Sequence, residues 1–84
     1  MATYTVKVDS CEAYPKIITE FNEVPDKHLE RVVYIAKKTF RSIEVTNEET
    51  GEIVLTHYVG ERLYEKEFGY GEAIDIISHY AYEK

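Results

Sequence analysis

The chain of 84 residues contains one cysteine and three histidines that could form a thiol–imidazole pair or bind a metal, namely Cys11, His28, His57 and His79. A cysteine acts as a nucleophile when a base such as histidine activates it in an electropositive setting. Nothing in the spacing brings Cys11 to a histidine, and its neighbour Glu12 makes the surroundings negative. There is no HxxxH or CxxC pair that would bring metal ligands together. The sequence therefore predicts neither nucleophilic catalysis nor a metal site.

Two pairs of carboxylates could perform general acid–base catalysis: Glu48 with Glu49, and Glu65 with Glu67. Glu48 and Glu49 fall in a turn, where we expect them to be fully solvated and to keep ordinary pKa values. The glycines of "GYGE", residues 69–72, lack the GK[ST] ending of a phosphate-binding loop. We therefore expect a protein that is not an enzyme and that holds no cofactor.

Acidic residues are concentrated in the second half of the chain. The net charge is −6, but residues 1–41 carry seven Lys or Arg and six Asp or Glu, whereas residues 42–84 carry three and ten. Phosphate backbones and anionic membranes repel such a domain. We expect no direct binding to nucleic acid or to membranes, and attraction to a basic protein surface. The alternative is an acidic surface that only promotes solubility.

Tyrosines lie among these acids. Tyrosine is enriched at protein interfaces, although it also fills the core and edges of small sheets. Acids two positions apart in a strand lie about 6.5–7 Å apart, close to the phosphate spacing along a nucleic acid strand. Glu65 and Glu67 would have this spacing if their segment is a strand. We predict one negative, tyrosine-edged surface that binds a partner protein. Its residues are Glu44, Glu48, Glu49, Glu52, Tyr58, Glu61, Tyr64, Glu65, Glu67, Tyr70, Glu72 and Asp75.

The elements that must position these residues follow from hydrophobic periodicity. In "TYTVKVD", residues 3–9, apolar and polar side chains alternate, which predicts a half-buried strand. The pattern of residues 10–24 is ambiguous. Pro15 argues against a long helix, and "KIITEF" fits either a second short strand or an irregular cover.

The rest of the chain predicts two helices and a hairpin. "PDKHLERVVYIAKKTF", residues 25–40, has apolar positions at helical spacing. Residues 41–60 predict a hairpin whose turn uses Gly51, because glycine takes a positive φ without steric cost. Residues 61–68 alternate weakly and could form a further antiparallel strand, and residues 71–82 predict a closing helix.

The second strand of this hairpin is apolar on both faces. By alternation, Ile53, Leu55 and Val59 share one face, and Val54 and Tyr58 share the other. Such a strand is either central in the sheet and covered on both sides, or its second face meets another chain. We expect a homodimer that covers this second face.

These elements predict one α+β domain over residues 1–84, with a small antiparallel sheet of three to four strands packed with two helices. A hydrophobic content of 44% is enough for a packed core. No apolar run is long enough to span a membrane, and "MATYTVKV" does not resemble a signal peptide. The single cysteine suits a reducing compartment, so we expect a cytoplasmic protein.

The "TNEETGEIV" hairpin and the "YGEAIDII" helix, in a tiny acidic chain rich in Tyr, Glu, Ile and Lys, resemble host-takeover proteins of phages that infect Gram-positive bacteria. The resemblance is one of size, charge and style across the chain, and it transfers no role to an individual residue. Some such proteins bind host DNA-binding proteins, among them the nucleoid protein HU, by imitating DNA. The resemblance implies inhibition by binding, in the cytoplasm of the host cell.

Two classes of function follow. The first is a non-enzymatic DNA mimic that binds a basic nucleoid or transcription protein and occupies its DNA-binding surface. The second is a general protein–protein interaction or assembly domain whose acidic surface is incidental. Binding that weakens steeply with salt favours the first class, and salt-insensitive binding favours the second.

Overall fold

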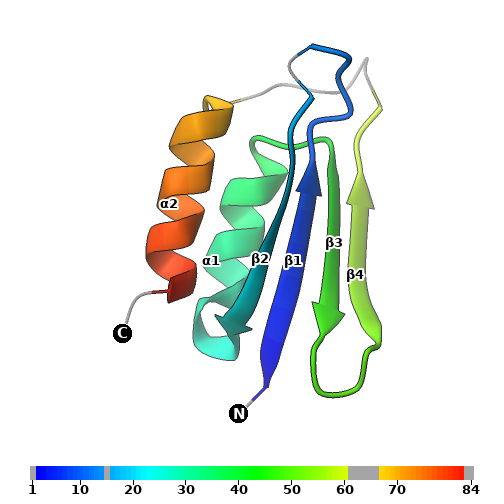
Figure 1. Ribbon diagram of the computed structural model, residues 1–84, viewed down its shortest axis with the longest axis vertical. Helices are drawn as coiled ribbons and strands as arrows, with labels where there is room; N and C mark the ends of the chain where they lie inside the picture. Colours follow the sequence, from blue (N-terminus) through cyan, green and yellow to red (C-terminus); the bar gives the residue numbers. More distant parts are fainter. Residues whose placement is uncertain (1, 15, 61–66, 83–84) are drawn as a thin grey trace.

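Four antiparallel strands form one sheet, and two helices cover one of its faces (Figure 1). The computed structural model describes residues 2–14, 16–60 and 67–82. The elements are β1 (Thr3–Asp9), β2 (Ile18–Pro25), α1 (Asp26–Lys37), β3 (Ser42–Asn47), β4 (Ile53–Tyr58) and α2 (Tyr70–Tyr82), and the sheet order is β2–β1–β3–β4. The predicted α+β class is thereby confirmed, and the last four residues of the ambiguous "KIITEF" segment, 18–21, belong to β2.

The core lies between the sheet and the helices. Alternate side chains of β1 and β3 point to this side, as the sequence predicts, and α1 and α2 bury their apolar stripes against them. Burial of these apolar side chains is the main force that holds the two layers together. The buried apolar residues are Val6, Val8, Phe21, Val24, Val32, Ala36, Phe40, Ile43, Val45, Tyr70, Ala73, Ile77 and Ala81.

Helix α1 follows β2 without a loop. Pro25 ends the strand and caps the helix with an extended backbone, at φ −69° and ψ 147°. Asp26 in the first turn interacts favourably with the helix dipole. At the other end the Phe40 N–H donates to the Ala36 carbonyl at 2.8 Å, and the chain then turns into β3. The helix therefore starts directly after β2, and the short turn of residues 38–41 connects its end to β3.

A bulge interrupts β2 where it pairs with β1. Tyr4 lies opposite Val24 and Val6 lies opposite Phe21, so that two residues of β2, Asn22 and Glu23, face one residue of β1. Glu23 has a φ of 57°, in the left-handed region that non-glycine residues rarely adopt. The bulge lets Phe21 and Val24, three positions apart, both enter the core.

A second bulge changes the faces of β4. Val45 pairs with Leu55 and Thr46 pairs with Ile53, which leaves Val54 as the extra residue. Val54 lines a groove against α1 together with Leu55, and Ile53 lies opposite Thr46 on the other side of the sheet. The alternation in the sequence therefore assigns Ile53 and Val54 to the wrong faces. A bulge inserts one extra residue into the strand, so strict alternation of the two faces is lost at that point. Strand β4 is also last in the sheet order of the described residues, and not central.

Candidate functional site

The face of the sheet away from the helices carries a row of charged side chains. Lys7 of β1 pairs with Glu20 of β2 on one side and with Glu44 of β3 on the other, and Thr56 of β4 completes the row. All four side chains are exposed. Because neighbouring strands lie about 4.8 Å apart, the backbones at Glu20 and Glu44 are separated by about 10 Å. Two carboxylates thus flank one ammonium group on a flat, solvated face.

The next row adds a third carboxylate. Asp9 of β1 lies between Ile18 of β2 and Ser42 of β3, and Tyr58 of β4 ends this row. We name Asp9, Glu20 and Glu44 the acidic sheet face. The sequence-based surface contained Glu44 but omitted the other two, since it took acids only from the second half of the chain. The alternation of β1 already places Asp9 on the same face as Lys7, whereas the position of Glu20 follows only from the pairing of β2 with β1.

Glu48 holds the hairpin turn to the rest of the sheet. Thr3 Oγ1 donates to Glu48 Oε1 at 2.7 Å, Thr5 Oγ1 donates to Oε2 at 2.8 Å, and the backbone N–H of Glu23 donates to Oε2 at 3.1 Å. The two threonine hydroxyls, followed by this N–H, lower the pKa of the Glu48 carboxyl. The expectation of a fully solvated carboxylate with an ordinary pKa is therefore wrong for Glu48, whose charge is already engaged within the chain.

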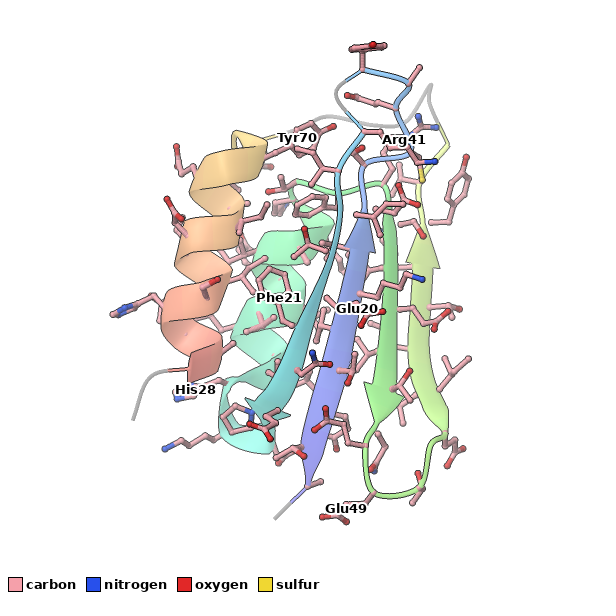
Figure 2. The ribbon with its side chains drawn as sticks, in the orientation of Figure 1. Glu20, Phe21, His28, Arg41, Glu49 and Tyr70 are labelled. Atoms are coloured by element: carbon pink, nitrogen blue, oxygen red, sulfur yellow. The ribbon has the colours of Figure 1, made fainter. Side chains whose placement is uncertain are left out.

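Glu49 and Glu52 project from the same turn, and both are exposed. Their backbone N–H groups are fixed locally: Glu49 donates to Asn47 Oδ1 at 2.9 Å and Glu52 donates to Thr50 Oγ1 at 3.2 Å. Gly51 supplies the expected positive φ, at 74°. With Glu48, these two acids form the hairpin tip, and Figure 2 places Glu49 at the end of the molecule opposite Tyr70.

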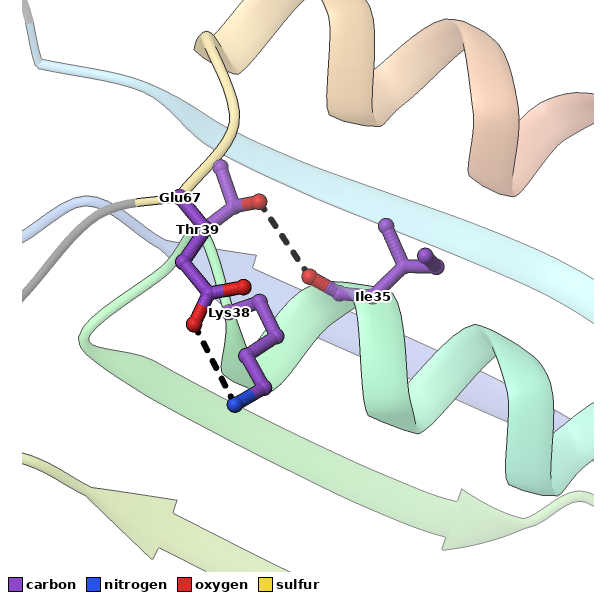
Figure 3. A network of polar contacts seen from close by, with 4 residues as sticks. All are labelled: Ile35, Lys38, Thr39 and Glu67. Carbon is purple, nitrogen blue, oxygen red and sulfur yellow. Dashed lines mark hydrogen bonds and ion pairs between the residues drawn. The ribbon is translucent and has the colours of Figure 1, made fainter.

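Glu67 lies in the segment before α2, and not in a strand. Its Oε1 forms an ion pair with Lys38 Nζ at 3.3 Å (Figure 3). The Glu67 N–H also donates to the Lys38 carbonyl at 2.9 Å. The strand geometry that would give Glu67 a phosphate-like spacing from Glu65 is therefore absent at Glu67, and Glu65 lies outside the described residues. Glu67 instead ties its segment to the C-terminal end of α1.

Tyr70 is a core residue. Its side chain is only 7% exposed, and its ring stacks on Phe40 with the centroids 5.4 Å apart. Such a ring has almost no area left for a partner, so the expectation that Tyr70 forms part of a binding surface is wrong. Tyr58, in contrast, is 66% exposed on the open face of the sheet. Arg41 Nη2 donates to the Tyr58 hydroxyl at 3.4 Å and holds the ring near that face.

The remaining acids of the proposed surface are separated from the hairpin. Glu72 and Asp75 are exposed on α2, which packs against α1 and β2 at the side of the molecule away from β4 (Figure 1). The described residues therefore form no continuous acidic surface from the hairpin to α2. Glu61 and Tyr64 lie outside the described residues, as does Glu65.

The nucleophile and metal candidates remain apart. Cys11 is exposed, and partial desolvation, followed by the Asp9 carboxylate, raises the pKa of its thiol. A raised pKa disfavours the thiolate form that a nucleophile requires. In residues 2–14, 16–60 and 67–82, no group of three or more His, Cys, Asp or Glu side chains converges as a metal site would require. No helix among the described residues is long and apolar enough to cross a membrane.

Comparison with protein-family models, with curated proteins and with solved structures gave no match for this chain.

Proposed function

We propose that this protein is a non-enzymatic inhibitor that binds a basic protein, such as a nucleoid protein of the HU type, and occupies its DNA-binding surface. The observation that carries this proposal is the position of Glu20 and Glu44 on either side of Lys7, on a sheet face that no described element covers. The partner-binding surface consists of the acidic sheet face and two residues of the hairpin tip, Glu49 and Glu52.

The chemistry of this face suits a cationic partner. Besides the carboxylates it exposes the hydroxyl group of Thr56, which can accept a hydrogen bond from Lys or Arg as a phosphate oxygen does. The backbones that carry Glu20 and Glu44 are about 10 Å apart across the strands. A flat array of hydrogen-bond acceptors with an excess of negative charge is the kind of surface that a DNA-binding groove attracts.

Long-range attraction would set the rate at which this complex forms. A net charge of −6 on an 84-residue chain steers a basic partner towards it and repels nucleic acid. Each exposed carboxylate contributes only about 0–1 kcal/mol through its own ion pair. The affinity therefore depends on several acids acting together, and it falls as added salt screens them.

The test is a competition experiment between this protein and DNA for HU. Wild-type protein should displace DNA, and the concentration required should rise with salt. The double variant Glu20→Gln/Glu44→Gln should compete several-fold less well. Glutamine is preferred to lysine at these positions, because lysines on both sides of Lys7 would repel it and weaken the sheet.

The matched control is Glu72→Gln/Asp75→Asn. It removes the same charge from exposed positions on α2, outside the acidic sheet face. If the two double variants lose the same ability to displace DNA, only the net charge of the protein matters. If DNA stays bound to HU at a large excess of wild-type protein, HU is excluded as the target. The second candidate function, an assembly domain, is favoured by the exposed apolar residues of β4, namely Ile53, Val54 and Tyr58, and binding independent of salt would support it.

A further inference from the structure

An apolar groove runs between α1 and β4. Its volume is about 570 Å³, and its apolar lining comes from Leu29, Val33 and Tyr34 of α1 and from Val45, Val54 and Leu55 of the sheet. The helices pack on β1, β2 and β3, so β4 extends beyond them. Tyr34 is 57% exposed and Val54 is 48% exposed. In a chain with a net charge of −6, β4 itself has the sequence IVLTHY and contains no Asp, Glu, Lys or Arg.

The charges of α1 along this groove are arranged with opposite signs at its two ends. Asp26 and Glu30 line the groove in the first half of the helix. Asp26 lies one turn further out, and the two charges nearest the middle of the helix are Glu30 and Lys37, the last helical residue. Both side chains are exposed. They are seven positions apart, which is two helical turns, so they lie on the same side of α1.

This arrangement is complementary to itself. Consider a two-fold axis that is perpendicular to α1 and passes between Val33 and Tyr34. Two copies of the helix related by this axis are antiparallel, and Glu30 of each copy faces Lys37 of the other. The same axis brings Tyr34 of each copy over the groove of the other. A two-fold interface uses one patch on both subunits, and this patch has an apolar centre and two opposite charges at equal distances from it.

We infer that the groove between α1 and β4 is the interface of a homodimer in which the two α1 helices are antiparallel, with reciprocal pairs between Glu30 and Lys37. The sequence instead predicts a dimer through the face of β4 that would carry Val54, Thr56 and Tyr58. In the structure Thr56 and Tyr58 lie on the open face of the sheet, whereas Val54 lines the groove. The interface along α1 leaves both acidic sheet faces uncovered, since they lie on the side of the sheet away from α1. The dimer could therefore present two of these faces at once.

Sedimentation velocity at tens of micromolar and low salt tests this inference. The wild-type protein should sediment with twice the 9.8 kDa mass of the chain. Lys37→Glu and Glu30→Lys should each weaken the dimer by about tenfold or more, because each places two like-charged pairs at the interface. The double variant Glu30→Lys/Lys37→Glu should recover the dimer, since the pairs are restored with their signs exchanged.

Lys16→Glu is the matched control, because Lys16 is exposed and lies outside the groove. It changes the net charge as Lys37→Glu does, and it should leave the dimer intact. Far-UV circular dichroism establishes that each variant is folded. A monomeric wild-type protein would overturn the inference, as would single variants that dimerise normally or a double variant that fails to recover. A monomer that still displaces DNA from HU would overturn the dimer without affecting the proposed inhibition.

Discussion

The backbone N–H of Glu23 donates a hydrogen bond to the Oε2 of Glu48, 25 positions later in the chain, at a distance of 3.1 Å. Glu23 is the bulged residue of β2 with a φ of 57°, and Glu48 begins the turn after β3. A left-handed backbone at a non-glycine residue is unfavourable unless its surroundings hold it in place. The carboxylate of Glu48 does so here, and it also accepts hydrogen bonds from Thr3 and Thr5 of the strand between them.

The first prediction concerns the contribution of Glu48 to stability. Glu48→Gln should lower the free energy of unfolding by about 1 kcal/mol, although exposure to solvent limits the effect. The amide has a single acceptor oxygen, and its NH2 group donates, so glutamine cannot accept the hydrogen bonds that now reach both oxygens of Glu48. Urea denaturation measures this change. Glu49→Gln is the matched control, since it removes the same charge one position later and outside this set of bonds. If the two variants are equally stable, the hydrogen bonds to Glu48 contribute nothing beyond its charge.

The second prediction is the pH dependence of the same difference. The pKa of Glu48 is lowered in the folded protein from an ordinary value of 4.5. A carboxyl with a depressed folded pKa stabilises the fold above its unfolded pKa, and this stability is lost as the pH falls through the folded pKa. The difference in stability between wild type and Glu48→Gln should therefore be largest near neutral pH and shrink below 4.5. Unfolding measured from about pH 6 to about pH 3 tests this. A difference that stays constant over that range would contradict the assigned shift.

The regular parts of the fold could be predicted from the sequence because their signals are local. Alternation identifies β1, helical spacing identifies α1, and the turn before Gly51 identifies the hairpin. The pattern of β2 was ambiguous for a physical reason. Its bulge places Phe21 and Val24 on the same face although they are three positions apart, so neither a period of two nor a helical period fits.

The candidate site was harder to predict, because it depends on which strands become neighbours. Glu20 and Glu44 are 24 positions apart and meet only through their common partner Lys7. The bonds of Glu48 similarly join segments that are distant in sequence. Nothing in a local window separates Glu48, whose charge is used inside the fold, from Glu49, which projects from the turn. The sequence indicated that acids are abundant in this region. It did not indicate which of them form hydrogen bonds within the fold and which face the solvent.

The third prediction concerns Tyr70, whose acidic neighbourhood in the sequence suggests exposure, whereas its ring is buried against Phe40. Tyr70→Ala should lower the free energy of unfolding by about 3 kcal/mol, because removal of a buried aromatic ring leaves a cavity at the start of α2. Tyr70→Phe should have a much smaller effect, since it keeps the stacked ring. Tyr14→Ala is the control for removal of a tyrosine, because Tyr14 is 94% exposed and its loss should change stability by no more than about 0.5 kcal/mol. Thermal or urea unfolding gives these values.

If Tyr70→Ala is as stable as Tyr14→Ala and instead loses affinity for a partner, Tyr70 acts at an interface and its packing against Phe40 is not part of the native core.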